Sequence, residues 1–217
     1  MVDYIKEKLR NNNVRFFAND NISQHVSDID LNTIRKNVND AVINLLDALV
    51  IDWENDHNTK ETAKRLTKMY VDEIFAGRFT DAPKITTFPN DKNLDELYTV
   101  GPITIRSMCS HHFVPILGKV WVGVIPNETL IGLSKFNRLV QWIGARPQIQ
   151  EETVEQIADE IEKVIDPQAL GVVMKASHMC MSLRGVKDND CEMTTSVMRG
   201  LFKTDISAKQ EFLRFIK

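Results

Sequence analysis

The stretch KVWVGVIP, residues 119–126, decides the fold because valine occupies every second position from 120 to 124. Successive side chains of a β-strand point to opposite faces, so this alternation predicts a strand with one uniform apolar face. The preceding stretch LYTVGPITIRSMC, residues 97–109, is rich in β-branched residues and predicts a second strand. Gly101 and Pro102 within it suggest a bend or a sheet edge.

The segments that follow predict two helices and then two more strands. SKFNRLVQWIGARP (134–147) has helical spacing, and the apolar residues of 154–164 predict another helix. GVVMKASHMCMSLRG (171–185) and CEMTTSVMRGLF (191–202) have strand composition. The order strand, strand, helix, helix, strand, strand predicts an α+β domain with an antiparallel four-stranded sheet. The open edges of such a sheet favour self-association.

The first part of the chain has a different pattern of apolar residues. This pattern predicts a helical region (residues 1–95) ahead of the strand-rich domain (residues 96–217). Apolar residues recur at steps of three and four from Leu31 to Leu49, which places them on one helix face. Asn58 and Glu61 resemble a capping box ahead of a second helix.

The composition is that of an ordinary globular protein, with 43% hydrophobic residues, 26% charged residues and a net charge of −3. No apolar run approaches the ~20 residues of a membrane helix, and the N-terminal stretch lacks the apolar core of a secretory signal. We therefore expect a cytoplasmic protein with no membrane or nucleic-acid partner. An anionic ligand would need a local cluster of lysine and arginine. Residues 1–28 are polar and weakly patterned, and we expect a loosely docked arm there.

Cysteine and histidine cluster at two places only, and both are candidate metal half-sites. In MCSHHFVP, Cys109 and His112 form a Cys-x-x-His pair, which suits Zn²⁺. In the second cluster, His178 and Cys180 are alternate residues of a predicted strand. They would then share a face about 7 Å apart, with Arg184 farther along that face.

Other interpretations of these residues remain open. Either cysteine alone could be a small buried apolar residue, and a Cys109–Cys180 disulfide is disfavoured by the reducing compartment expected for this protein. Four ligands, Cys109, His112, His178 and Cys180, would close the shell and make the site structural. Three ligands would leave a position for water and make it catalytic, with His111 to spare.

A second group of polar residues surrounds the predicted helix at 134–147. Ser134, Lys135 and Arg138 gather at its start, where free N–H groups and two cations could hold a polyphosphate, although a solvated basic helix end is the alternative. Gln150 and Glu151 follow. A carboxylate can accept two parallel hydrogen bonds from guanine, but Glu151 could equally be an ordinary acidic residue at a helix N-terminus.

The chain resembles the GTP cyclohydrolase I family in several stretches that occur in the same order and spacing. They are MCSHHFVP, IGLSKFNRLV, ARPQIQEE, ASHMCMSLRGV and MTTSVMRGLF, together with the upstream AKRLTKMYVDEIFAGR. The resemblance covers about residues 30–217.

This resemblance implies the tunnelling fold, in which the sheets of neighbouring subunits join into a barrel. Two pentameric rings stack into a homodecamer with active sites at subunit boundaries. It also implies a zinc-dependent hydrolase that converts GTP and water to 7,8-dihydroneopterin triphosphate and formate. That reaction is the first step toward folate, other pterins or deazaguanine nucleosides.

Carried over residue by residue, the resemblance implies zinc ligands at Cys109, His112 and Cys180. It places a general acid/base at His178 and a second catalytic histidine at His111, and we assign Ser134 to proton transfer near the sugar. The implied substrate-binding residues are Gln150 and Glu151 for guanine, Lys135, Arg138 and Arg184 for the triphosphate, and Arg65 and Lys68, which reach a neighbouring subunit's site.

One departure from the family pattern is Ser110, which stands where the family usually has glutamate between the cysteine and the two histidines. That acid is not a zinc ligand, so the metal site should survive the change. Two alternative functions are a zinc-stabilised, non-enzymatic nucleotide-binding oligomer and a related enzyme of the same fold that acts on a pterin. A closed four-ligand shell would favour the former, and the retained guanine and triphosphate positions argue against the latter.

Overall fold

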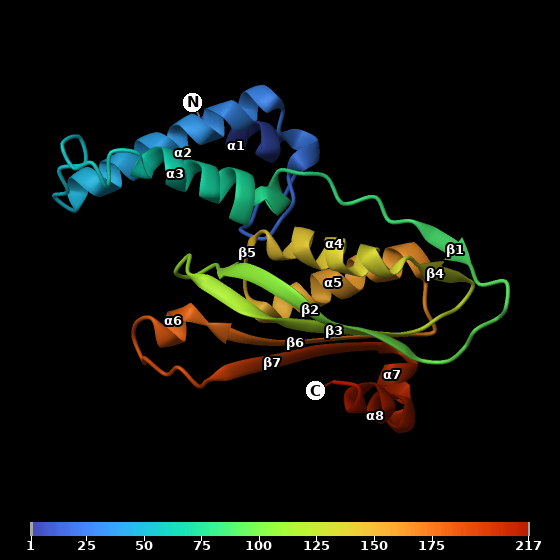
Figure 1. Cartoon of the computed structure of the whole chain (residues 1–217). Helices are drawn as coiled ribbons and strands as arrows, with labels where there is room; N and C mark the ends of the chain where they lie inside the picture. Colours follow the sequence, from blue (N-terminus) through green and yellow to red (C-terminus); the bar gives the residue numbers. More distant parts are fainter. Residues whose placement is uncertain (1, 217) are drawn as a thin grey trace. The chain divides into compact units, whose positions relative to one another are not determined.

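The computed structural model describes residues 2–216, which form two compact units that divide between Asp81 and Ala82 (Figure 1). The division lies before the predicted boundary at residue 95. Strand β1 (Thr87–Pro89) pairs with β4 (Thr129–Ile131), and this pairing assigns it to the second unit. None of the described helices combines the length and apolar character that crossing a membrane requires.

The first unit is helical. Helix α1 (Val2–Asn11) buries Ile5 and Leu9 in a cluster with Ile22, so these residues pack into the unit and do not form the loosely docked arm that their polarity suggests. The other elements are α2 (Asp28–Ala48), α3 (Thr62–Lys68), the π-helical segment η2 (Met69–Ile74) and the 3-10 turns η1 (Ser23–His25) and η3 (Ala76–Arg78).

Helix capping in this unit differs from the prediction. The capping box lies at the start of α2, where Ser27 and Asp30 bond reciprocally and Lys8 donates to Asp30 at 2.9 Å. The predicted box at Asn58 is wrong, because the backbone N–H of Asn58 donates to the side chain of Asp56 and α3 starts later without a side-chain cap.

The second unit is built on a sheet with strand order β5-β2-β3-β6-β7. Its strands are β2 (Tyr98–Cys109), β3 (Pro115–Ile125), β5 (Pro147–Gln148), β6 (Ala169–His178) and β7 (Glu192–Gly200). The four long strands pair antiparallel, which confirms the predicted α+β class, and the two-residue β5 adds a parallel edge beside β2.

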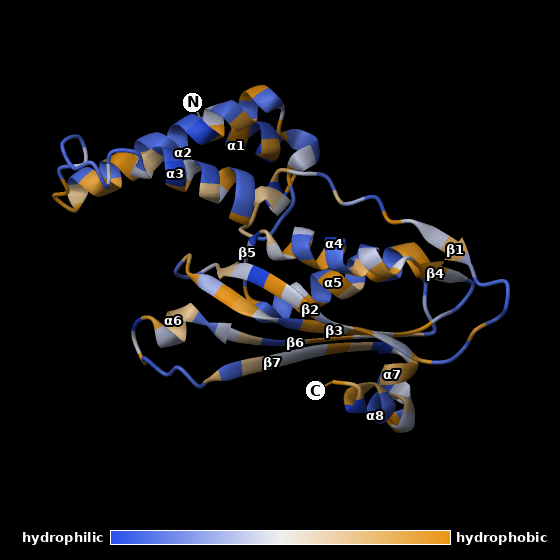
Figure 2. Ribbon diagram, viewed as in Figure 1, coloured by the Kyte–Doolittle hydropathy of each residue, from blue (hydrophilic) through white to orange (hydrophobic). Residues whose placement is uncertain are grey.

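Helices α4 (Leu133–Gly144) and α5 (Gln150–Ile165) cover one face of this sheet (Figure 1). The alternating valines of β3 are fully buried in the core beneath them, together with Phe136 and Ile143 of α4 and Ile157 of α5. Both helices carry polar and apolar stretches in Figure 2, as expected where only one side is buried. The side-chain alternation of residues 119–126 therefore fixes which face of the sheet the helices cover.

The opposite face is covered at one end by two short helices that the sequence analysis did not predict, α7 (Leu201–Thr204) and α8 (Ile206–Arg214). Phe212 of α8 is fully buried over Gly123 and Gly171, which are direct neighbours on β3 and β6. A Cβ atom at either glycine would approach the Phe212 ring to 2.5 Å or less. The two glycines thus form the slot that docks α8.

The segment around His178 also differs from the prediction. Strand β6 ends at His178, and the next residues form the short helix α6 (Met179–Ser182). The expected continuous strand through residue 185, with His178, Cys180 and Arg184 on one face, is therefore wrong. A strand ladder cannot continue here, because β3, its neighbour, begins at Pro115, and Ile116 pairs with His178.

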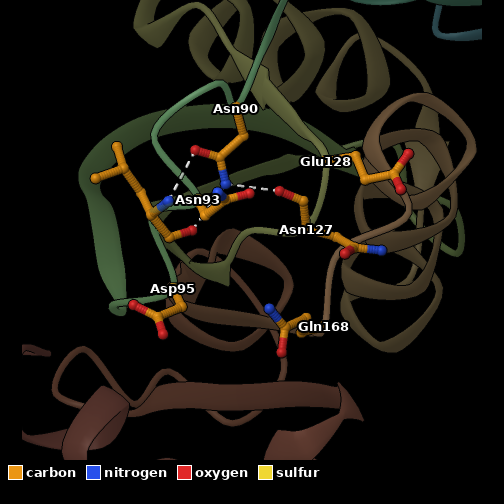
Figure 3. Close-up of a pocket in the computed structure, with 7 residues that line it drawn as sticks. Asn90, Asn93, Asp95, Asn127, Glu128 and Gln168 are labelled. Atoms are coloured by element: carbon orange, nitrogen blue, oxygen red, sulfur yellow. Dashed lines mark hydrogen bonds between the residues drawn. The ribbon is translucent and has the colours of Figure 1, made fainter.

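A polar hollow of about 270 Å³ lies among the loops at the other end of the second unit and contains none of the predicted site residues (Figure 3). The Asn90 side chain donates to the carbonyls of Leu94 (2.8 Å) and Asn127 (2.7 Å) and accepts from the N–H of Leu94 (2.9 Å). These bonds join two loops, so we assign Asn90 a structural role.

Replacing Asn90 with alanine should lower the free energy of unfolding by about 1–3 kcal/mol, because it removes three hydrogen bonds made by a buried side chain. Urea titration would measure this change. Asn127→Ala is the matched control, since Asn127 contributes its backbone carbonyl and should stay near wild-type stability. Equal losses in the two variants would show that the side-chain bonds of Asn90 do not stabilise the loops.

Candidate metal centre and active site

A tight turn at the end of β2 brings Cys109 and His112 together. The N–H of Phe113 donates to the Cys109 carbonyl and the N–H of Cys109 donates to the Val114 carbonyl, both at 2.9 Å. Phe113 adopts a left-handed conformation with φ of 51°, which few bulky residues do. The N–H of Ser110 donates to the carbonyl of Gln148, so β5 anchors the turn.

Cys180 meets this turn from the first residues of α6, directly after β6. One ligand atom from each of Cys109, His112 and Cys180 lies within 4.8 Å of the others. The three predicted ligands are therefore adjacent. Their approach comes from the helical turn after β6, not from two same-face positions on a strand.

The donor set fits zinc. Burial and the neighbouring Cys109 thiol raise the pKa of Cys180, while Arg184 acts in the opposite direction. Two adjacent thiols resist joint ionisation unless a cation compensates their charge. Two sulfurs and an imidazole nitrogen are the ligands that Zn²⁺ prefers, and a set of three leaves a position for water.

His178, at the end of β6, is held by Gln150, the first residue of α5. The nitrogen Nε2 of His178 lies 2.8 Å from Oε1 of Gln150. The amide nitrogen of Gln150 donates to the carbonyls of Met174 (3.1 Å) and Met193 (2.9 Å), and its side chain is fully buried.

These contacts fix the histidine tautomer. Carbonyl groups accept and never donate, so the atom of Gln150 that faces Met174 and Met193 must be the NH₂ group. Its carbonyl oxygen then faces His178 and can only accept, so Nε2 of His178 carries a proton. Nδ1 is the nitrogen left free to exchange a proton with a ligand. Burial lowers the pKa of His178, while the nearby Glu151 carboxylate opposes the shift, so the ring is neutral at rest near neutral pH.

The two cysteine ligands, Gln150 and His178 line a cavity of about 550 Å³ in the second unit, whose lining does not include His112. Of the predicted site residues it contains Cys109, His111, Gln150, Glu151, His178 and Cys180. His111 also places Nδ1 at 3.8 Å from the sulfur of Cys109. The sequence analysis missed the other lining residues, which are Gln148, Ile149, Met181, Cys191, Glu192 and Met193. Of these residues, only Cys191 could have been singled out from the sequence, because cysteine is a residue type that binds metals or reacts.

Arg184 also lies at this site, because Nη1 of its guanidinium donates to Nε2 of His112 at 2.9 Å. An arginine is always charged and has several donors, so this contact leaves others to meet an anionic ligand. The predicted substrate residue is thus beside the metal-ligand group.

Three other predicted residues are separated from this cavity within the chain. Ser134, Lys135 and Arg138 lie in the first turns of α4, which Gly132 precedes as N-cap. The cavity is reached from the other end of α4, through β5 and the start of α5. A helix of 12 residues is about 18 Å long, so one chain does not bring the two groups together.

Arg65 and Lys68 belong to the first unit. They lie on α3 and line a separate hollow of about 490 Å³ that also includes Arg35, Glu61, Lys64, Thr67 and Asp72. Arg35 is paired with Asp72 at 2.7 Å and Lys68 with Glu73 at 3.4 Å. No ion pair links Arg65 to a carboxylate within the described residues 2–216, so its guanidinium can meet an anion.

The arrangement in the second unit suits hydrolysis. Two of the three candidate metal ligands, a neutral imidazole with one free nitrogen and a carboxylate at a helix start line one cavity, and the third ligand, His112, lies beside them. Such a set can activate water, move a proton and hold a ligand by hydrogen bonds.

Known proteins match the chain over most of its length. The family model described as GTP cyclohydrolase I matches residues 38–217. GTP cyclohydrolase 1 of Enterobacter sp. (strain 638) is 40% identical over 193 residues, which is 88% of this chain and 86% of that protein. GTP cyclohydrolase 1 of Serratia proteamaculans (strain 568) is 39% identical over 190 residues, 87% of this chain and 86% of that protein. The chain therefore belongs to the GTP cyclohydrolase I family of enzymes.

Proposed function

We propose that the chain is a zinc-dependent GTP cyclohydrolase that opens the guanine imidazole ring at C8, releases formate and forms 7,8-dihydroneopterin triphosphate. The observation that supports it best is the convergence of Cys109, His112 and Cys180, two of which line the cavity where Gln150 holds His178. Zinc held by these three ligands would bind water and lower its pKa toward ~7.

His178 moves the proton that makes the guanine ring reactive. Carbon C8 is a poor electrophile until N7 of guanine is protonated, and an imidazole can take up a proton and deliver it there. With the Nε2 proton donated to Gln150, the transfer runs through Nδ1. In the neutral ring Nδ1 is unprotonated, so it first takes up a proton from solvent and then passes it to N7 of guanine. Gln150 thus acts mainly by positioning His178, because its own side chain is occupied with protein partners.

Glu151 orients the base. It lies in the first turn of α5 and lines the cavity, so its carboxylate can accept from N1–H and the exocyclic amine of guanine together. This pairing supplies proximity and orientation for the attack at C8. His111 and Ser134 are assigned to proton transfer near the ribose during the later rearrangement.

Glu151→Gln should lower kcat/KM for GTP strongly while leaving the metal content unchanged. An amide offers one acceptor and a mismatched donor, and the lost charged hydrogen bonds correspond to about 1.5–3 kcal/mol. Steady-state kinetics and metal analysis would measure the two quantities. The exposed neighbour Glu152, changed to Gln, is the control for altered charge at the start of α5. Near-normal kcat/KM in Glu151→Gln would remove Glu151 from guanine recognition.

The triphosphate is held by Lys135, Arg138 and Arg184, with Arg65 and Lys68 contributed by a neighbouring subunit. The proposal includes the tunnelling-fold barrel and the decamer of two pentameric rings. Separation of the start of α4 from the Cys109 cavity supports a shared site, as do the open edges of the sheet. The cytoplasmic location stays a prediction.

The test is a turnover assay with GTP that follows formate and a triphosphate-bearing pterin, on protein of known metal content. Turnover that is lost on chelation and restored by zinc is the expected result. Tight GTP binding without formate release at full zinc occupancy would instead support a non-enzymatic nucleotide-binding oligomer.

A further inference from the structure

Three cationic side chains lie close together on the sheet face that α4 and α5 do not cover. They are Arg106 on β2, Lys119 on β3 and Lys175 on β6, and we name them the cationic strip. The alternate residues of the same strands, such as Ile105, Val120 and Met174, are fully buried under the helices, which fixes the orientation of the strip.

The register places like charges opposite each other. Lys119 and Lys175 are direct partners on neighbouring strands, and Thr104 is the partner of Lys119 on its other side. Arg106 is two residues along from Thr104 on the same face. Directly opposed like charges destabilise a sheet, so this pairing has an energetic cost for the protein alone.

Neutral groups hold both lysines. Lys119 donates to the Thr104 hydroxyl at 2.8 Å, and the ammonium of Lys175 lies 5.6 Å from the centre of the Trp121 ring. Within residues 2–216, no salt bridge within 4.0 Å involves Arg106, Lys119 or Lys175. The positive charge of the strip is therefore uncompensated.

The surroundings of the strip add hydroxyl donors. Thr194 of β7 is the partner of Lys175. Ser177 lies two residues beyond Lys175 on β6. A carboxylate in the adjoining register is that of Glu192, the partner of Ser177 at the start of β7, where it lines the Cys109 cavity. Helix α8 covers only the Gly123–Gly171 end of this face, and Arg106 and Lys119 are exposed.

We propose that the cationic strip binds a small polyphosphate anion at a site separate from the Cys109 cavity. Neighbouring strands are about 4.8 Å apart, so the strip spans about 10 Å across three strands, which suits a short chain of phosphoryl groups. The Arg106 guanidinium can bind phosphate oxygens in pairs, and the lysines act as point charges. The overall charge of −3 and the narrow width do not suit the phosphate backbone of a nucleic acid.

The test measures binding of inorganic tripolyphosphate to the full chain by calorimetry. The double variant Lys119→Thr, Lys175→Thr keeps strand-forming residues and should lose one class of site, weakening affinity there about tenfold or more. Its kcat and KM for GTP should match those of the wild type. The control Lys92→Ala, Lys209→Ala removes the same charge from exposed positions elsewhere in the second unit and should keep the site.

Thermal unfolding at low salt gives a second, independent measurement. It stays informative if the double variant binds poorly only because it is partly misfolded. Lys175→Thr alone should melt above the wild type without anion, because it relieves the opposed charges. Tripolyphosphate should raise the Tm of the wild type more than that of the variant. Equal binding by all variants, or equal loss in the control, would overturn the proposal. Tighter binding of a single-stranded oligonucleotide than of tripolyphosphate would overturn the ligand class.

Discussion

Replacing Cys180 with serine should remove the metal and abolish GTP turnover together. Cys180 supplies one of the three ligand atoms that converge within 4.8 Å, and a serine hydroxyl is a much poorer zinc ligand than a thiolate. Two remaining ligands cannot hold the ion tightly. We expect about one zinc ion per wild-type chain and almost none in the variant, measured by elemental analysis after dialysis.

Cys191→Ser is the matched control for this experiment. Cys191 lines the same cavity and is a free thiol, but it is outside the convergent group of three. It should therefore keep its zinc. Metal loss in both variants would identify a thiol-rich shell different from the proposed one. Full turnover by metal-free Cys180→Ser would contradict zinc dependence altogether.

The variant His178→Ala tests whether the metal has three protein ligands, with a position open for water, or four. If His178 lies outside the metal shell, this variant should keep its zinc and lose about 10²–10⁴-fold in kcat, the usual contribution of a general acid/base. The structure gives Nε2 of His178 a protein partner, Gln150, which supports this outcome. Loss of zinc from His178→Ala would favour four ligands and a structural site.

The class of fold could be predicted because its signal is local. The alternation of residues 119–126 is a property of one strand, and burial of every second side chain follows from it. The end of β6 at His178 could not be predicted in this way. Residues 179–182 have strand composition, but the neighbouring strand β3 begins at Pro115 and offers them no further pairing partner. Only the register between β3 and β6 in the structure shows this.

The same distinction between local and long-range signals applies to the candidate site. Cys-x-x-His is a local motif, so Cys109 and His112 could be found from the sequence and their turn confirms that they meet. The role of Gln150 could not be found, because its partners Met174 and Met193 come from two strands distant in the sequence. The opposed pair Lys119 and Lys175 was missed for the same reason, since neither residue is unusual until the register is known.

Mixing two inactive variants should restore activity if the site is shared between subunits. Cys180→Ser lacks a metal ligand and Arg65→Ala lacks a cation of the first unit, so rings of either variant alone should be inactive. In mixed rings, some sites would combine an intact metal centre from one chain with an intact Arg65 from its neighbour. GTP turnover should then reappear in proportion to those sites.

This expectation rests on the separation, within one chain, of the predicted triphosphate residues of α4 from the Cys109 cavity. Ser134, Lys135 and Arg138 begin a helix whose far end leads to the cavity. The control is a mixture of Cys180→Ser with Cys109→Ser, which should stay inactive, because both changes damage the same metal centre. Mixed rings that are verified by mass spectrometry and yet recover nothing would argue against a shared site. A fully active monomer would refute the assembly, because its cations could not come from a neighbour.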